Sequence, residues 1–255
     1  MAMELFASEG HTCISFHDLV KGEGIQANQF LITHNDHSAL IDPGGALTYT
    51  PLSMAVSRHI RLKDLDYIFA SHQDPDIIAS VDKWLMYTNC KVVVSKLWGR
   101  FVPHLVPSYM EHKSLDRYEL LPDQGEDVPF GDSYIKCIPA HFLHSVGNFH
   151  FYDPVSKILF SGDVGASLVD GDPSHPVEDF DDHLKSMAAF HQRYMNSNKI
   201  CRYWTNMIRG LDVEMIVPQH GQPFKGKAMV SRFLDWFGQL ECGTDMMTQA
   251  NYRLP

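Results

Sequence analysis

The sequence contains few cysteines and none of the cysteine patterns that hold zinc or build a disulfide framework. Five cysteines are spread through 255 residues, and no two of them form a C-x-x-C pair. An odd number of widely separated cysteines predicts reduced thiols packed in the core. The five are Cys13, Cys90, Cys137, Cys201 and Cys242.

Long apolar runs and a basic leader are also missing. No stretch of about 18 apolar residues occurs, which argues against a membrane-spanning helix. The N-terminal residues show no positively charged segment followed by an apolar one, as a secretory signal would. The sequence therefore predicts a cytoplasmic protein with no membrane partner.

Basic residues are outnumbered, with 21 Lys and Arg against 31 Asp and Glu and a formal charge of −10. This balance disfavours nucleic acid or an anionic membrane surface as a partner, because both require clustered positive charge. Repeats, low-complexity tracts and Ser/Gly/Pro-rich linkers are absent as well. With 44% hydrophobic residues, we expect a single domain over residues 1–255 with a full core.

Predicted strands and helices alternate along much of the chain, which indicates a layered α/β architecture. Residues 97–118 are irregular and read either as a lid over a pocket or as a surface excursion. We expect strands at residues 14–16, 29–33, 39–41, 65–70, 91–95, 133–139, 147–152, 157–160 and 214–218, and helices at 52–61, 78–87, 178–195, 198–211 and 228–241.

One histidine and two aspartates follow the apolar run at residues 65–70. His72, Asp74 and Asp76 are spaced two residues apart, so they can share a metal ion only if the loop curls around it. Pro75 restricts Asp74 to extended backbone and stiffens such a curl. On this stretch alone, a metal site and an ordinary loop or helix cap stay open.

Three later strand ends carry further ligand types. His144 follows the strand that ends near residue 138, Asp163 follows residues 158–160, and His220 follows residues 216–218. Four such loops are unlikely to converge by chance, so together they predict a metal site. Asp42, after another strand, is either near this site or part of a plain turn.

The order of these residues resembles the metallo-β-lactamase superfamily. H-x-D-x-D is followed by a later His, an Asp after Ser-Gly, and a final His-Gly after an apolar strand. The resemblance implies an α/β fold of four layers, an αββα sandwich in which helices flank two mixed β-sheets. Asp74 stands where zinc hydrolases of the superfamily have an imidazole, and this suits non-haem iron better than hydrolytic zinc.

Residues 143–149 and 72–76 also resemble small di-iron oxygen-binding relatives of the flavodiiron proteins. This resemblance implies two iron ions, with zinc or manganese as alternatives, and O2 or a peroxo species as ligand. The first iron would be held by His72, Asp74 and His144 and the second by Asp76 and His220, with Asp163 bridging them.

The chain departs from the flavodiiron pattern at two positions. A glutamate is replaced by Asp74, and the histidine expected after Asp76 is replaced by Ile77. The second metal site is therefore either weak or left with an open coordination position. His141 is a candidate replacement ligand or an outer-shell residue. We assign no role to His34, His37, His150 and His175.

Few residues follow His220, too few for a fused flavodoxin-like domain, so we expect no bound flavin. The resemblance then implies an oxygen sensor or carrier. If the protein is an enzyme, slow O2 or NO reduction with an external electron donor is expected, which makes it an oxidoreductase. The alternatives are a dinuclear hydrolase and a binding module with a degenerate site. A signalling partner, an external reductase and a homodimer stay open.

Overall fold

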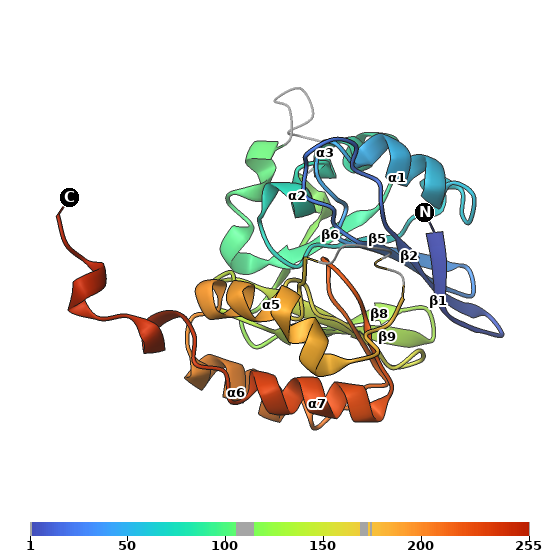
Figure 1. Cartoon of the computed structure of the whole chain (residues 1–255). Helices are drawn as coiled ribbons and strands as arrows, with labels where there is room; N and C mark the ends of the chain where they lie inside the picture. The colour runs from blue at the N-terminus through green and yellow to red at the C-terminus, as the bar shows by residue number, and fades with distance from the viewer. Residues whose placement is uncertain (1, 106–114, 169–172, 174, 255) are drawn as a thin grey trace.

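The computed structural model describes residues 2–105, 115–168, 173 and 175–254. Two β-sheets pack face to face, and helices cover the outer face of each (Figure 1). The first sheet contains β1 (Ala2–Ser8), β2 (His11–Phe16), β3 (Gln29–His34), β4 (His37–Ile41), β5 (Tyr67–Phe69), β6 (Lys91–Ser95) and β7 (Tyr118–Leu121) in that order. The second contains β13 (Phe224–Lys225), β12 (Met215–Val217), β11 (Ile158–Phe160), β10 (Phe149–Asp153), β9 (Ser133–Pro139) and β8 (Glu126–Phe130) in that order.

Both sheets are mixed. In the first, β4 to β7 run parallel to their neighbours, whereas β1 to β4 pair antiparallel. In the second, only the β11–β12 pair is parallel among the described strands. The prediction of two mixed sheets in an α/β fold is confirmed.

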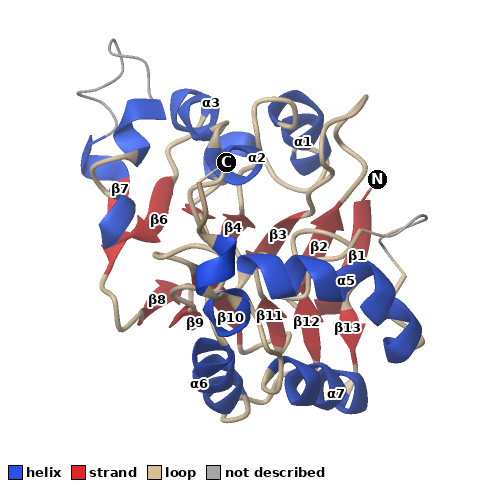
Figure 2. Ribbon diagram, turned by 60° about the vertical axis from the view of Figure 1, so that its left-hand side comes forward, coloured by secondary structure: helices blue, strands red, loops and turns tan. Residues whose placement is uncertain are grey.

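Three apolar layers hold the sandwich together. Alternate strand residues of both sheets point inward and pack against each other, as the period of two in a strand requires. Helices lie on each outer face of the sandwich (Figure 2). Between these helices and the sheets, a second set of side chains is buried on each side. The helices are α1 (Tyr49–Val56), α2 (Pro75–Ile78), α3 (Val81–Tyr87), α5 (Phe180–Tyr194), α6 (Asn198–Ile208) and α7 (Lys227–Phe237). The layer between the sheets includes Phe30, Ile32, Phe69, Val93, Phe130, Phe149, Phe151, Phe160 and Val217.

Four strands and two helices differ clearly from the sequence prediction. We did not predict β1, β7 and β8, because most of their side chains are exposed or half-buried and give no continuous apolar run, and β13 has only two residues. The helix expected at residues 52–61 is α1, which begins three residues earlier and ends at Val56. The helix expected at residues 78–87 is divided into α2 and α3, and it begins earlier because Pro75 is favoured at the first helical position. Of the irregular segment 97–118, residues 106–114 lie outside the described part of the chain.

Helix α5 is amphipathic and begins at a capped N-terminus. The Asp179 carboxylate accepts hydrogen bonds from the backbone N–H groups of Asp181 and Asp182, which satisfies two donors that have no partner within the helix. Across the described residues, no helix combines the length and apolar character needed to cross a membrane.

Candidate metal centre

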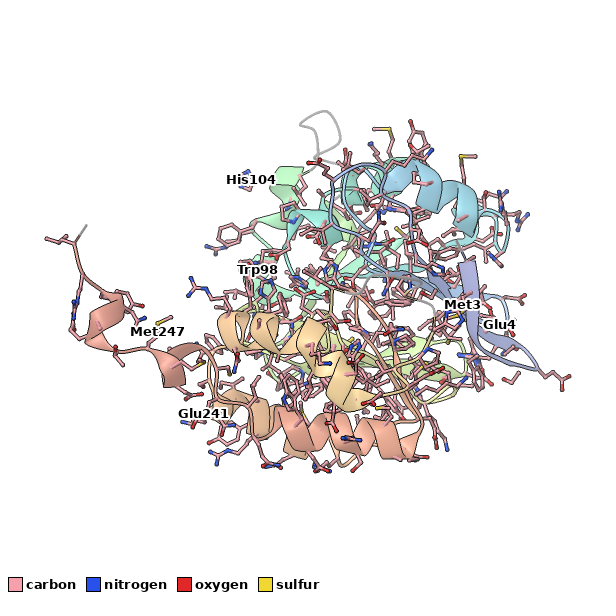
Figure 3. All side chains as sticks on the ribbon, in the orientation of Figure 1. Met3, Glu4, Trp98, His104, Glu241 and Met247 are labelled. Atoms are coloured by element: carbon pink, nitrogen blue, oxygen red, sulfur yellow. The ribbon has the colours of Figure 1, made fainter. Side chains whose placement is uncertain are left out.

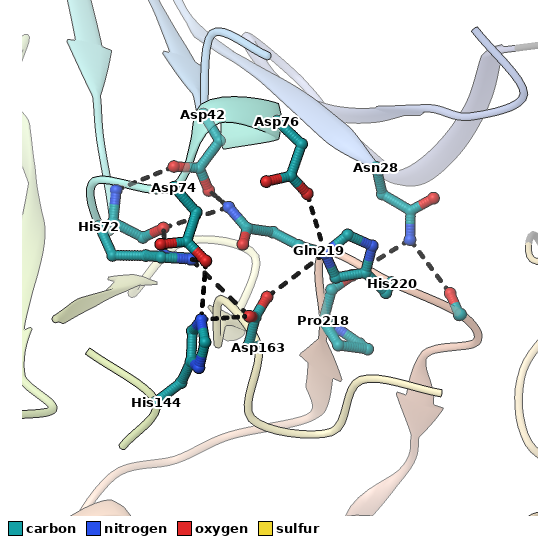
Figure 4. A network of polar contacts seen from close by, with 12 residues as sticks. Asn28, Asp42, His72, Asp74, Asp76, His144, Asp163, Pro218, Gln219 and His220 are labelled. Atoms are coloured by element: carbon teal, nitrogen blue, oxygen red, sulfur yellow. Dashed lines mark hydrogen bonds and ion pairs between the residues drawn. The ribbon is translucent and has the colours of Figure 1, made fainter. Parts of the chain in front are cut away.

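The six side chains predicted to hold metal meet at one place, although they come from four separate loops (Figure 4). Each loop lies beyond the end of a short buried strand, so rigid elements position the side chains. The loop after β5 supplies His72 and Asp74, and the first turn of α2, which follows directly, supplies Asp76. The β9–β10 loop supplies His144, the loop after β11 supplies Asp163, and the loop after β12 supplies His220.

Four of these residues form one tight group. Ligand atoms of His72, Asp74, His144 and Asp163 all lie within 4.8 Å of one another. His144 Nε2 is 2.8 Å from Asp74 Oδ2, and His72 Nε2 is 3.7 Å from the same oxygen. Donors that bind one metal at about 2.0–2.3 Å are separated by similar distances. This group can therefore surround a single ion.

Asp163 faces a second group with its other oxygen. Its Oδ2 lies 3.7 Å from His72 Nε2 and 3.4 Å from His144 Nε2. Its Oδ1 lies 3.4 Å from His220 Nε2, which is 3.5 Å from Asp76 Oδ2. One carboxylate thus lies between two sets of donors, which is the arrangement of a bridging ligand in a dinuclear centre.

Among the six candidate ligands, two side-chain atoms are buried and have no hydrogen-bond partner among the described residues. They are His72 Nε2 and Asp163 Oδ1. A buried polar atom without a partner costs about 1–3 kcal/mol, so it calls for an explanation such as an ion. Imidazole nitrogen and carboxylate oxygen are suitable ligands for iron, zinc and manganese. The residues present therefore fit a pair of divalent metal ions.

Hydrogen bonds at the far ring nitrogen orient two of the imidazoles. His72 Nδ1 lies 2.9 Å from Ser71 Oγ, and His220 Nδ1 donates to the carbonyl oxygen of Gln26 at 2.7 Å. With the proton assigned to Nδ1, each Nε2 keeps a lone pair directed at the site. The Gln26 carbonyl, which can only accept, therefore selects the His220 tautomer that can bind metal, and Ser71 is compatible with the same tautomer of His72.

Charge interactions couple Asp74 and His144. The hydrogen bond from His144 holds the pKa of the Asp74 carboxyl below its usual range, although burial opposes this shift. Burial lowers the pKa of His144, but the hydrogen bond to Asp74 and the nearby Asp163 charge outweigh it and leave the pKa raised. In the metal-free protein these two side chains form an ion pair that a bound cation would replace.

Backbone strain is concentrated around the same loops. His144 has a φ of +70°, Phe142 has +66° and Asp42 has +58°. Residues other than glycine rarely adopt this left-handed conformation, and it costs of the order of 1–3 kcal/mol at functional sites. The surrounding contacts must hold these residues in place.

A cavity of about 620 Å³ opens onto five of the six side chains, all except His72. Most of its wall is apolar or aromatic, which lowers the local dielectric constant and strengthens charge interactions inside. Besides the acidic and imidazole side chains, its lining includes Ile25, Ala166, Leu168, Ala189, Phe190 and Tyr194, with Ser167, Lys185 and Ser186 as polar members.

Asp42 connects two of the loops from behind the site. Its fully buried carboxylate accepts hydrogen bonds from the backbone N–H of Ser71 at 2.8 Å and from Gln219 Nε2. Gln219 Nε2 also donates to Ser71 Oγ at 3.1 Å. Asp42 is therefore more than a turn residue. Sequence reasoning missed Gln219, although its position directly before His220 could have suggested a supporting role.

Replacing Gln219 with leucine should weaken metal binding by about 10- to 100-fold, the range typical of outer-shell changes. The reason is that leucine cannot hold Ser71 and Asp42, so the loops that carry His72 and His220 lose their link. A competition titration against a chelator measures the affinity. Gln239→Leu, at an exposed glutamine on the protein surface, is the control, and equal affinities in the two variants would contradict the prediction.

The metal-free protein should lose stability as the pH rises through the range in which Asp42 ionises. Burial raises the pKa of Asp42 from 3.8 to about 7. Between these values the folded state binds more protons than the unfolded state, so the free energy of unfolding falls as pH increases. The loss should be on the order of 4 kcal/mol. Urea unfolding across this range should show a smaller fall in Asp42→Asn than in the wild type, and the dependence that remains comes from other groups with shifted pKa values, such as Asp74 and His144.

Two predicted outer residues do not join the ligand atoms. His141 Nε2 donates to the backbone oxygen of Asp123 at 2.7 Å, and His141 is absent from the cavity lining. Ile77 is fully buried within α2 and also does not line the cavity. The described residues thus offer no replacement for the histidine that Ile77 displaces.

A second buried group of ligand types lies elsewhere in the described chain. His11 Nε2 is 2.7 Å from Asp153 Oδ2, and Cys13 Sγ is 3.5 Å from the same oxygen. Ser156 Oγ also donates to Asp153. Burial alone would raise the pKa of Asp153, but the hydrogen bonds from His11 and Ser156 hold it below its usual range. Because these atoms are paired with each other, we interpret the group as a buried hydrogen-bond network.

The chain is similar to proteins of one known family and to two of their solved structures. The family described as "ODP family beta lactamase" matches residues 25–221. A solved structure described as the peroxy diiron species of chemotaxis sensor ODP is 39% identical, with a TM-score of 0.85 over 96% of this chain and 97% of that chain. The apo state of chemotaxis sensor ODP from T. denticola is 40% identical, with the same TM-score and coverage.

More distant relatives include longer proteins. An uncharacterised protein of Methanocaldococcus jannaschii is 26% identical over 87% of this chain and 55% of its own length. A putative diflavin flavoprotein of Synechocystis sp. is 25% identical over 85% of this chain and 36% of its own length. The chain thus spans about half or less of these curated relatives. A flavo di-iron protein structure from Thermotoga maritima, 17% identical over 93% of this chain and 60% of its own, shares the fold with a TM-score of 0.76.

Proposed function

The chain belongs to the family described as ODP family beta lactamase, and we propose that it is a di-iron protein that binds O2 as an oxygen sensor or carrier. The observation that carries the proposal is the position of Asp163, whose two oxygens face two separate groups of donors. The similar chemotaxis sensor ODP, described as a peroxy diiron species, supports iron and O2 as the occupants.

Each side chain has a defined role in this proposal. Three carboxylates would offset most of the charge of two Fe(II) ions and leave a small positive excess, which favours an anionic oxygen ligand. When bound, the two irons would supply the electrons for O2 chemistry. His72, Asp74 and His144 would hold one ion and Asp76 and His220 the other, with Asp163 between them.

The remaining residues orient the donors and limit water. Ser71 and the Gln26 carbonyl fix the rings of His72 and His220. Phe190 lies against the His144 ring at a centroid distance of 6.0 Å, and Ile25 forms another part of the cavity wall. An apolar wall beside the donors reduces competition from water and strengthens the attraction for a small anion.

Anaerobic loading with Fe(II) followed by O2 tests the proposal. We expect two iron ions per chain. Addition of O2 should produce a visible absorption band, and this band should persist. A colourless protein that holds two zinc ions would contradict it. If that protein hydrolysed a phosphodiester or thioester and lost this activity in His144→Ala, the hydrolase alternative would replace the proposal.

The two functions that the proposal allows require different partners. A sensor requires a protein partner that responds to its state, whereas slow reduction of O2 or NO requires an external electron donor. The similarity to the chemotaxis sensor ODP favours O2 binding over turnover. We therefore favour an oxygen sensor over an O2 or NO reductase.

A further inference from the structure

Helix α5 contacts two of the loops that carry candidate ligands. His191, fully buried on α5, accepts a hydrogen bond from the backbone N–H of Gly165 at 2.8 Å, two residues after Asp163. At the end of the helix, the ring of Tyr194 lies against the ring of His144 with centroids 5.2 Å apart. A shift in either loop therefore acts on the same helix.

The end of α5 is also joined to the His144 loop through the backbone. Leu143 and Met195 form an antiparallel bridge, and the N–H of Asn196 donates to the carbonyl of Phe142 at 3.2 Å. Phe142 and His144 are the two strained residues of this loop. Strained backbone next to a binding site can change conformation with a small change in contacts.

A third segment continues this connection. The backbone N–H and the side-chain hydroxyl of Thr244 donate to the carbonyl of Asn196 at 2.8 Å and 3.0 Å. Gly243 has a φ of +50°, and an added Cβ would lie 2.2 Å from the carbonyl oxygens of Met195 and Asn196. Only glycine can pack this closely. The His144 loop, the end of α5 and residues 243–245 are thus bonded in series.

Residues 243–254, which we call the C-terminal arm, extend away from the body of the protein (Figure 1, Figure 3). The arm contains two short turns, at Gly243–Met246 and Gln249–Asn251. Its apolar side chains are largely exposed, with Met246 51%, Tyr252 72% and Leu254 96% accessible. The arm therefore gains little stability from the core, and its position depends on the contacts at residues 243–245.

We propose that the C-terminal arm is the output element of the metal centre. The proposal rests on the proposed function, because it assigns a route for the signal of a sensor. When a cation replaces His144 as the partner of Asp74, the His144 loop changes its contacts. The Leu143–Met195 bridge and the Asn196 carbonyl pass this change to Thr244, and the arm moves or becomes more mobile.

Hydrogen exchange measured by mass spectrometry tests this coupling. We compare the metal-free, Fe(II)-loaded and O2-treated full chain, and follow peptides that contain residues 243–252. The exchange of the amides at the base of the arm should change by roughly tenfold between the metal-free and loaded states. Identical exchange in all three states would overturn the proposal.

Two glycine variants provide a matched comparison. Gly243→Ala should displace the base of the arm and abolish the change in exchange, while the absorption band with O2 persists. Gly226→Ala is the control, because Gly226 also has a positive φ, of +89°, but an added Cβ meets nothing within 4 Å. Thr244→Val, which removes only the hydroxyl contact, should reduce the change and serves if Gly243→Ala does not fold. If Gly243→Ala and Thr244→Val both kept the full change in exchange, as the control Gly226→Ala should, the proposed route would be overturned.

Failure of this inference can be told apart from failure of the proposed function. Loading with Zn(II) occupies the donors without O2 chemistry and should also change exchange in the arm. An arm that responds to metal in a protein without an O2 band rejects the oxygen function but keeps the coupling. A protein with the O2 band and an unresponsive arm rejects the coupling alone.

Discussion

Replacing Asp163 with asparagine should leave no more than one iron ion per chain and abolish the absorption band that O2 produces. An amide presents one oxygen and one NH2 group, so only one of the two donor groups can keep a ligand at this position. The change also removes the negative charge of a residue that is only 4% exposed and that would lie between two cations. We expect the affinity for the second ion to fall by about a hundredfold or more, beyond typical outer-shell effects.

Iron content by elemental analysis and the absorption spectrum measure the two effects of Asp163→Asn. Asp235→Asn is a suitable control, because this carboxylate is exposed and pairs with Arg209 on the surface. The control should bind two ions and give the band. Two tightly bound ions in Asp163→Asn would show that Asp163 does not lie between them.

The six candidate ligands could be predicted because each follows a short apolar strand. His72, Asp163 and His220 each lie three residues after the last buried residue of β5, β11 and β12, respectively. Parallel and antiparallel strands of a sandwich bring such ends to a common edge. The strand pattern alone could not give the distance between the loops, and the bridging role of Asp163 was predicted only from the family resemblance.

The supporting residues could not be predicted, because their roles depend on contacts between distant segments. Gln219 and Asp42 are 177 positions apart, yet they share a hydrogen bond in the interior. In the sequence, His191 looks like any polar residue of an amphipathic helix. Only the fold brings it to the backbone N–H of Gly165, from which it accepts a hydrogen bond. In the same way, the glycine at position 243 is required only because α5 ends beside it.

The fold prediction failed where side chains carry little burial information. Edge strands such as β1 alternate between exposed and half-buried residues, so their pattern is weaker than that of β6, which contains three buried valines. Asp74 shows a different limit. As the residue before Pro75 it is extended, which makes it both the N-terminal boundary of α2 and a donor in the metal group.

Binding of Fe(II) should raise the midpoint of thermal unfolding by about 10 °C. Without metal, His72 Nε2 and Asp163 Oδ1 are buried without a hydrogen-bond partner, and three carboxylates lie close together. A ligand at a thousandfold excess over its dissociation constant stabilises the folded state by about 4 kcal/mol. For a chain of this size each kcal/mol corresponds to about 2–4 °C. Anaerobic calorimetry with and without Fe(II) measures the shift.

The same experiment on Asp163→Asn separates metal binding from general stabilisation. In the metal-free state this variant should be at least as stable as the wild type, because it removes a buried charge whose Oδ1 has no hydrogen-bond partner among the described residues. It should then gain little from Fe(II). A metal-free variant that is much less stable than the wild type would mean that Asp163 supports the fold itself. If the metal-free variant is at least as stable as the wild type, the buried charge of Asp163 lowers the stability of the metal-free protein and is kept because it is needed to bind metal.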